Sequence, residues 1–84
     1  MPAEPPPEDT AARLLWLEAR AEKAYADMYD APFGTPAAAL YSDAKEFLYD
    51  AIGLAQRLGK EDEAERLSRR LDHIKAVFRS QFPG

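Results

Sequence analysis

Three segments of this 84-residue chain carry apolar residues at helical spacing, and two breaker segments separate them. Each residue turns an α-helix by about 100°, so spacings of three and four return a side chain to the same face. The first breaker is "DAPFGTP" at residues 30–36, and the second is the glycine at position 59. We therefore expect helices over about residues 10–29, 36–58 and 62–81.

The second apolar stripe is the widest and covers about 160° of the helical wheel, more than the roughly 100° that one neighbour requires. This helix is therefore expected in the middle. Long helices with short connections favour antiparallel neighbours, so we predict an all-α fold, an up-down-up antiparallel three-helix bundle. Gly53 falls opposite this stripe, where it either weakens the helix without benefit or lets another backbone approach.

Residues that favour helix ends support these boundaries. Asp9 and Thr10 are both residue types that cap the first amides of a helix. Pro36 suits a first helical position, while Ser42 offers a rival start that the sequence leaves open. Gly59 suits the left-handed conformation with which many helices end.

The first eight residues contain four prolines and are expected to form a flexible arm, without a fixed partner, ahead of a single helical domain at 9–84. The beginning of the chain has neither the charge nor the apolar run of a signal peptide, and no stretch is apolar enough to span a membrane. The chain has no cysteine, which suits a reducing compartment. We expect a cytoplasmic protein without membrane contact.

The charge balance is acidic, with a net charge of −4. Residues 1–30 carry the whole excess, with seven acidic side chains against three basic ones. Proteins dedicated to nucleic acids draw their affinity mainly from cations that meet phosphates. The composition therefore argues against a dedicated nucleic-acid binder.

The residue types that perform catalysis are scarce. His73 is the only histidine and is expected on an exposed face, with no recognisable serine nucleophile or second ligand near it. A carboxylate-bridged di-metal bundle needs a histidine from each of two helices, and a phosphate loop needs a glycine-rich turn that is missing here. We expect no catalytic, metal or cofactor site and no enzymatic activity.

The third helix carries a basic outward face that is a candidate anion site. Its members are Arg66, Arg69, Arg70 and His73. Acidic side chains three or four residues away can neutralise Arg66 and Arg69, which is the ordinary role of such a face. Arg70 has no acid at that distance and is expected to be the least neutralised.

Trp16 and Leu15 are the apolar residues of the first helix that its stripe does not explain. They lie about 130° to either side of the stripe, too far apart for both to face the same pair of helices. The tail, Arg20 or another chain can cover the indole. Tyr49 and Phe33 add aromatic surface, and such residues near arginine often anchor interfaces.

These observations predict a small non-enzymatic protein-interaction or self-association module. Its expected interface consists of Leu15, Trp16, Tyr49 and Phe33. The simplest partner is a second copy in a homodimer, because one patch then serves twice, and another protein is the alternative partner. The alternative function is weak binding of an anion or nucleic acid at the basic face of the third helix.

Overall fold

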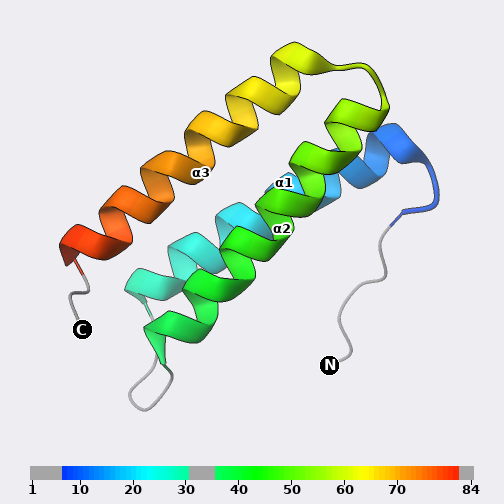
Figure 1. The fold of residues 1–84 in the computed structure, drawn as a ribbon. Coiled ribbons are helices and arrows are strands. Elements are labelled where there is room, and N and C mark those ends of the chain that lie inside the picture. The colour runs from blue at the N-terminus through cyan, green and yellow to red at the C-terminus, as the bar shows by residue number, and fades with distance from the viewer. Residues whose placement is uncertain (1–6, 31–35, 82–84) are drawn as a thin grey trace.

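Three helices of nearly equal length make up the fold (Figure 1). The computed structural model describes residues 7–30 and 36–81. Helix α1 spans Thr10–Tyr29, α2 spans Ala37–Arg57 and α3 spans Glu61–Gln81. The chain reverses direction between successive helices, so α1 and α3 run parallel to each other and antiparallel to α2 (Figure 1). The predicted all-α, up-down-up arrangement is confirmed.

The starts of α1 and α2 are fixed in different ways. Asp9 caps α1, where its Oδ2 accepts a hydrogen bond of 2.9 Å from the backbone N–H of Ala12. Helix α2 begins at Ala37, so the start near Pro36 is observed rather than the rival start at Ser42. Pro36 stands at the N-cap in an extended conformation, one residue before the first helical position expected for it, and it supplies no side-chain hydrogen bond.

Gly59 ends α2 in the left-handed conformation predicted for it, with φ of 72°. Its N–H donates to the carbonyl of Gln56 at 3.0 Å, and the next N–H, of Lys60, donates to the carbonyl of Ala55 at 2.8 Å. This pair of bonds is the Schellman motif, which satisfies the last carbonyls of a helix. The tight reversal starts α3 only two residues later.

Helix α2 is the middle helix, as predicted, and packs against α1 on one side and α3 on the other. The core contains small and branched side chains from all three helices. Its buried members are Leu14, Leu17, Ala21, Ala24, Met28, Ala44, Leu48, Ala51, Leu54, Ala55, Ala64, Leu67, Leu71 and Ile74. Tyr25 is half-buried and packs against this core.

The predicted arm lies mostly outside the described residues, which begin at Pro7. The carbonyl of Pro7 accepts a 3.0 Å hydrogen bond from Nε of Arg13. Within residues 7–30 and 36–81, no helix has the length and apolar character that crossing a membrane requires.

Replacing the two internal glycines of the described chain with alanine should change the free energy of unfolding in opposite directions. Gly59→Ala forces a side chain into the left-handed region and should lower the free energy of unfolding by about 1 kcal/mol. Gly53→Ala should raise it by about 0.5–1 kcal/mol, because alanine favours the helix and a Cβ there would meet only the guanidinium of Arg57 at 3.6 Å. Urea unfolding followed by circular dichroism measures both, and a destabilised Gly53→Ala protein would contradict this account.

Candidate interaction surface

Trp16 lies half-buried between α1 and α2. Its ring meets the ring of Phe47 on α2 edge to face, with centroids 5.9 Å apart, and the guanidinium of Arg20 lies 5.1 Å from the indole centroid. The indole Nε1–H is buried and has no acceptor among the described residues. Packing against Phe47 and the cation of Arg20 therefore hold the ring in place. Of the candidates for covering the indole that the sequence offered, the structure places Arg20 over it.

A hollow of about 500 Å³ opens beside this ring, between α1 and the outer face of α2. We call it the Trp16 hollow, and its lining includes Arg13, Trp16, Phe47, Tyr49, Gly53 and Arg57. The structure thus brings together two members of the predicted interface, Trp16 and Tyr49. Phe33, a third predicted member, lies outside the described residues.

Leu15 is 69% exposed and is not part of the hollow. It shares a helical face with Glu18 and Glu22, which lie three and seven residues further along α1. These two carboxylates contact α3, so Leu15 belongs to the α3 side of α1. The predicted interface therefore divides into two separate surfaces.

Tyr49 stands on the outer face of α2 and is 53% exposed. Its hydroxyl accepts a 2.8 Å hydrogen bond from Nζ of Lys75 on α3, and the same ammonium lies 5.2 Å from the ring centroid. The hydrogen bond raises the pKa of Lys75 above its usual value. Lys75 therefore fixes the position of an aromatic ring that solvent still reaches.

The charged residues at the Trp16 hollow form no ion pair within the part of the chain that the structure describes. Asp50 and Arg57 form neither an ion pair nor a hydrogen bond with any described residue, and Arg13 donates only to the carbonyl of Pro7. Helical spacing places Arg13 on the Trp16 side of α1, but it did not reveal Phe47 or Arg57 as site residues. The sequence feature that could have indicated this surface is Gly53, because Asp50 lies three residues before it and Arg57 four residues after it on the same helical face.

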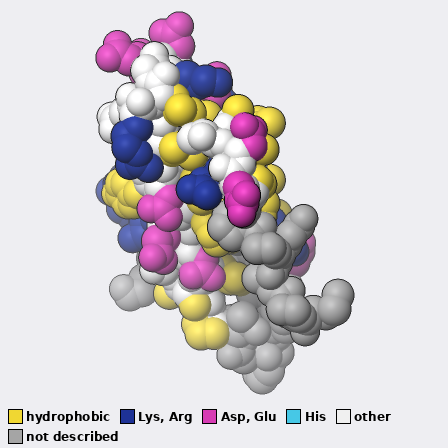
Figure 2. Space-filling model, turned by 90° about the vertical axis from the view of Figure 1, so that its right-hand side faces the viewer, with side chains coloured by type: hydrophobic (Ala, Val, Ile, Leu, Met, Phe, Trp, Pro, Cys, Tyr) yellow, Lys and Arg dark blue, Asp and Glu magenta, His cyan; other side chains and the backbone are white. Residues whose placement is uncertain are grey.

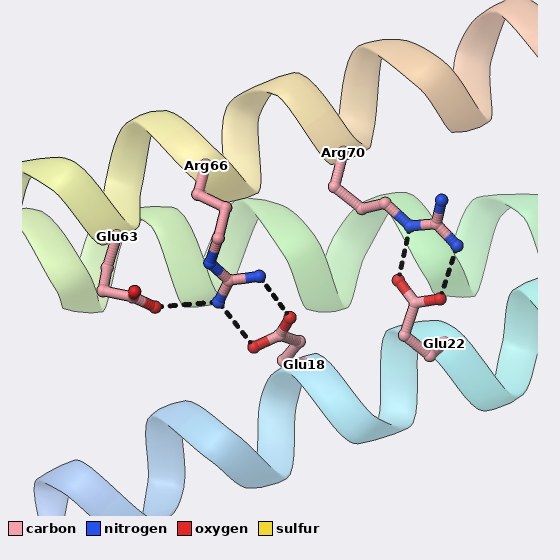
Figure 3. A network of polar contacts seen from close by, with 5 residues as sticks. All are labelled: Glu18, Glu22, Glu63, Arg66 and Arg70. Atoms are coloured by element: carbon pink, nitrogen blue, oxygen red, sulfur yellow. Dashed lines mark hydrogen bonds and ion pairs between the residues drawn. The ribbon is translucent and has the colours of Figure 1, made fainter.

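Arg66 on α3 is fully engaged with carboxylates of the same chain (Figure 3). Its two terminal nitrogens donate to both carboxylate oxygens of Glu18 on α1, at 2.7 and 2.9 Å, and Nη2 also donates to Glu63 at 2.8 Å. The hydrogen bond from Arg66 holds the pKa of Glu18 below its usual value, against the opposing effect of burial. This arginine therefore joins α1 to α3.

Arg70 repeats the same connection one turn later (Figure 3). Its Nε and Nη2 donate to Glu22 at 2.7 and 2.6 Å, and its guanidinium lies 5.1 Å from the ring centroid of Tyr25. The expectation that Arg70 is the least neutralised arginine is wrong. An acid from another helix neutralises it, and local spacing within α3 carries no information about that partner.

The rest of the predicted anion site is exposed. Arg69 pairs with Glu65 at 2.7 Å, four residues earlier, which is the ordinary helical pairing expected for it. His73 is exposed, as its place on the helical wheel predicts. The structure therefore places Arg66, Arg69 and Arg70 along α3 with each guanidinium already bound to a carboxylate of the same chain.

Charges of both signs are mixed on the face in Figure 2, with hydrophobic side chains between them. Across the described ranges, no group of three or more histidine, cysteine or acidic residues has an arrangement that could hold a metal ion. Comparison of the chain with protein families, curated proteins and solved structures gives no match.

Glu18 should contribute to stability in a pH-dependent manner. Its pKa is lowered in the folded chain, so its contribution is complete above the ordinary value of 4.5 and is lost as the pH falls through the folded pKa. We expect Glu18→Gln to lower the free energy of unfolding at pH 7 and to have a smaller effect at pH 3. Chemical denaturation at both pH values provides the measurement.

Glu46→Gln is the matched control, because Glu46 is exposed and forms no ion pair with a described residue. It should leave the free energy of unfolding close to that of the unaltered chain at both pH values. If Glu18→Gln lowered the free energy of unfolding equally at pH 7 and pH 3, the ion pair with Arg66 would not be the source of a pH-dependent stabilisation.

Proposed function

We propose that this chain is a small, non-enzymatic protein-interaction module that contacts its partner through the Trp16 hollow. The observation that carries the proposal is the combination of exposed aromatic surface with two arginines, Arg13 and Arg57, that have no ion-pair partner in the described chain. Tryptophan, tyrosine and arginine are the residue types most enriched at the energetic centres of interfaces. Their arrangement around a concave surface supports this use.

The walls of the hollow are held in place before any partner arrives. Phe47 and Arg20 fix the indole, and Lys75 fixes the ring of Tyr49. Ordering flexible side chains opposes association, so groups that are already ordered leave more of the interaction energy for binding. These contacts support the hollow, rather than the surrounding exposed charges, as the contact surface.

The alternative, weak binding of anions or nucleic acid at α3, lacks comparable support. A phosphate at Arg66 or Arg70 would have to displace a bidentate carboxylate, which is among the stronger polar contacts in proteins. Arg69 and His73 remain as exposed side chains on a chain with a net charge of −4. Long-range attraction of a polyanion is correspondingly weak.

The proposal includes a protein partner and a cytoplasmic location. A chain without cysteine gains nothing from an oxidising compartment, which is the reason for placing it in the cytoplasm. Peptides and protein segments with acidic and apolar side chains match the hollow, because its walls are aromatic and its unpaired arginines are cationic.

A peptide library displayed on phage tests the proposed surface without requiring knowledge of the partner. Selected peptides should bind the unaltered chain and change the fluorescence of Trp16, the only tryptophan. Gly53→Leu should abolish their binding, because the added side chain projects into the hollow while its Cβ has room in the helix. Leu15→Lys should leave binding unchanged, since Leu15 lies on a different surface.

Circular dichroism should first show that both variants retain the helical fold, and binding is then compared. Peptides that bind Gly53→Leu as well as the unaltered chain would place the contact surface elsewhere. Loss of binding in Leu15→Lys alone would assign it to the α3 side of α1.

A further inference from the structure

Gly53 lies on the outer face of α2, four residues before the last residue of the helix, where nothing in the described chain requires a glycine. Its helical conformation is one that every residue adopts, since Gly59 is the only described glycine with positive φ. A Cβ built at Gly53 would meet only a terminal nitrogen of Arg57, at the ordinary contact distance of 3.6 Å. Glycine is nevertheless among the residues least favourable to a helix interior. What its small size provides is access to the backbone from outside.

Two unpaired charges of opposite sign flank Gly53 on the same face. Asp50 precedes it by three residues, about 4.5 Å along the helix axis, and Arg57 follows it by four residues, about 6 Å along the axis. Both are exposed, and neither forms an ion pair or hydrogen bond within the described chain. An antiparallel helix crossing at Gly53 with the same sequence would bring its acid to the level of this arginine.

We propose that two copies of this chain associate through α2, antiparallel and crossing at Gly53, with Asp50 of each copy paired to Arg57 of the other. The inference rests on the proposed function, because the Trp16 hollow lies on this face, and it names the partner as a second copy. A two-fold axis through the crossing point makes the contact self-complementary, so each ion pair occurs twice. No additional surface on the chain is needed.

Charge complementarity favours this occupant. Each copy has a net charge of −4, so two copies repel each other unless cations lie at the contact. The two-fold arrangement places both unpaired arginines opposite unpaired acids. It also brings the second helix over Tyr49, whose ring is 53% exposed in the single chain. The same contact therefore covers apolar surface and neutralises the two charges.

Charge reversal with rescue tests the arrangement. Sedimentation equilibrium over a wide concentration range should give a dimer for the unaltered chain. Asp50→Arg and Arg57→Asp should each weaken association by about tenfold or more, because like charges then face each other twice. The double variant should restore association to within about threefold, because each pair is rebuilt with its charges exchanged.

Two further variants separate pairing from other effects. Asp72→Arg, at an exposed position of α3, makes the same change in net charge as Asp50→Arg and should not weaken association, because Asp72 lies outside the proposed contact. Arg57→Gln removes the cation without placing an acid in the last turn of α2. A negative charge there would be disfavoured by the helix dipole. Circular dichroism should show the same helix content in all variants.

A chain that remains monomeric at every concentration overturns this inference. The proposed function is then tested by the peptide selection alone. A dimer in which the double variant is no better than the single variants overturns the crossing at Gly53. That second result leaves interaction through the hollow standing, provided that Gly53→Leu still prevents peptide binding.

Discussion

The packing of α2 against both of its neighbours through small side chains is the constraint on which the rest of the structure depends. Ala44, Ala51 and Ala55 have no exposed surface, so α2 presents little more than its backbone at these points. Close packing places the larger side chains Leu48 and Ile74 in one core cluster and removes them from water. With α1 and α3 both placed against α2, long arginine and glutamate side chains bridge these two parallel helices.

Much of the fold was predictable because it depends on local chemistry. Apolar spacing located the three helices, Asp9 and Gly59 marked two of their ends, and the width of its stripe identified the middle helix. The bridge between α1 and α3 was not predictable in the same way. Glu18 and Arg66 are 48 residues apart, and their contact depends on the register in which the two helices lie. The pair of Arg69 with Glu65, by contrast, lies within one helix, so helical spacing predicts it correctly.

The candidate site was predictable in part, for a related reason. A helical wheel gives the direction in which Trp16 leaves α1, but it does not give the reach of a large ring toward Phe47 on another helix. It also separates Leu15 from Trp16 without indicating which of them α2 covers. Tyr49 was identified because exposure follows from the position of α2 alone. The hollow required the relative placement of two helices, which the pattern along one helix does not contain.

The two internal glycines of the described chain distinguish constraints within the fold from constraints outside it. Gly59 has a positive φ and completes the hydrogen bonds at the end of α2, so the fold itself accounts for it. Gly53 has neither feature, and the described ranges of the chain leave room for a Cβ there. A residue that weakens its helix without an internal benefit is best explained by something that approaches from outside. The unpaired Asp50 and Arg57 lie at that same place, so the backbone and the charges of α2 support one common explanation.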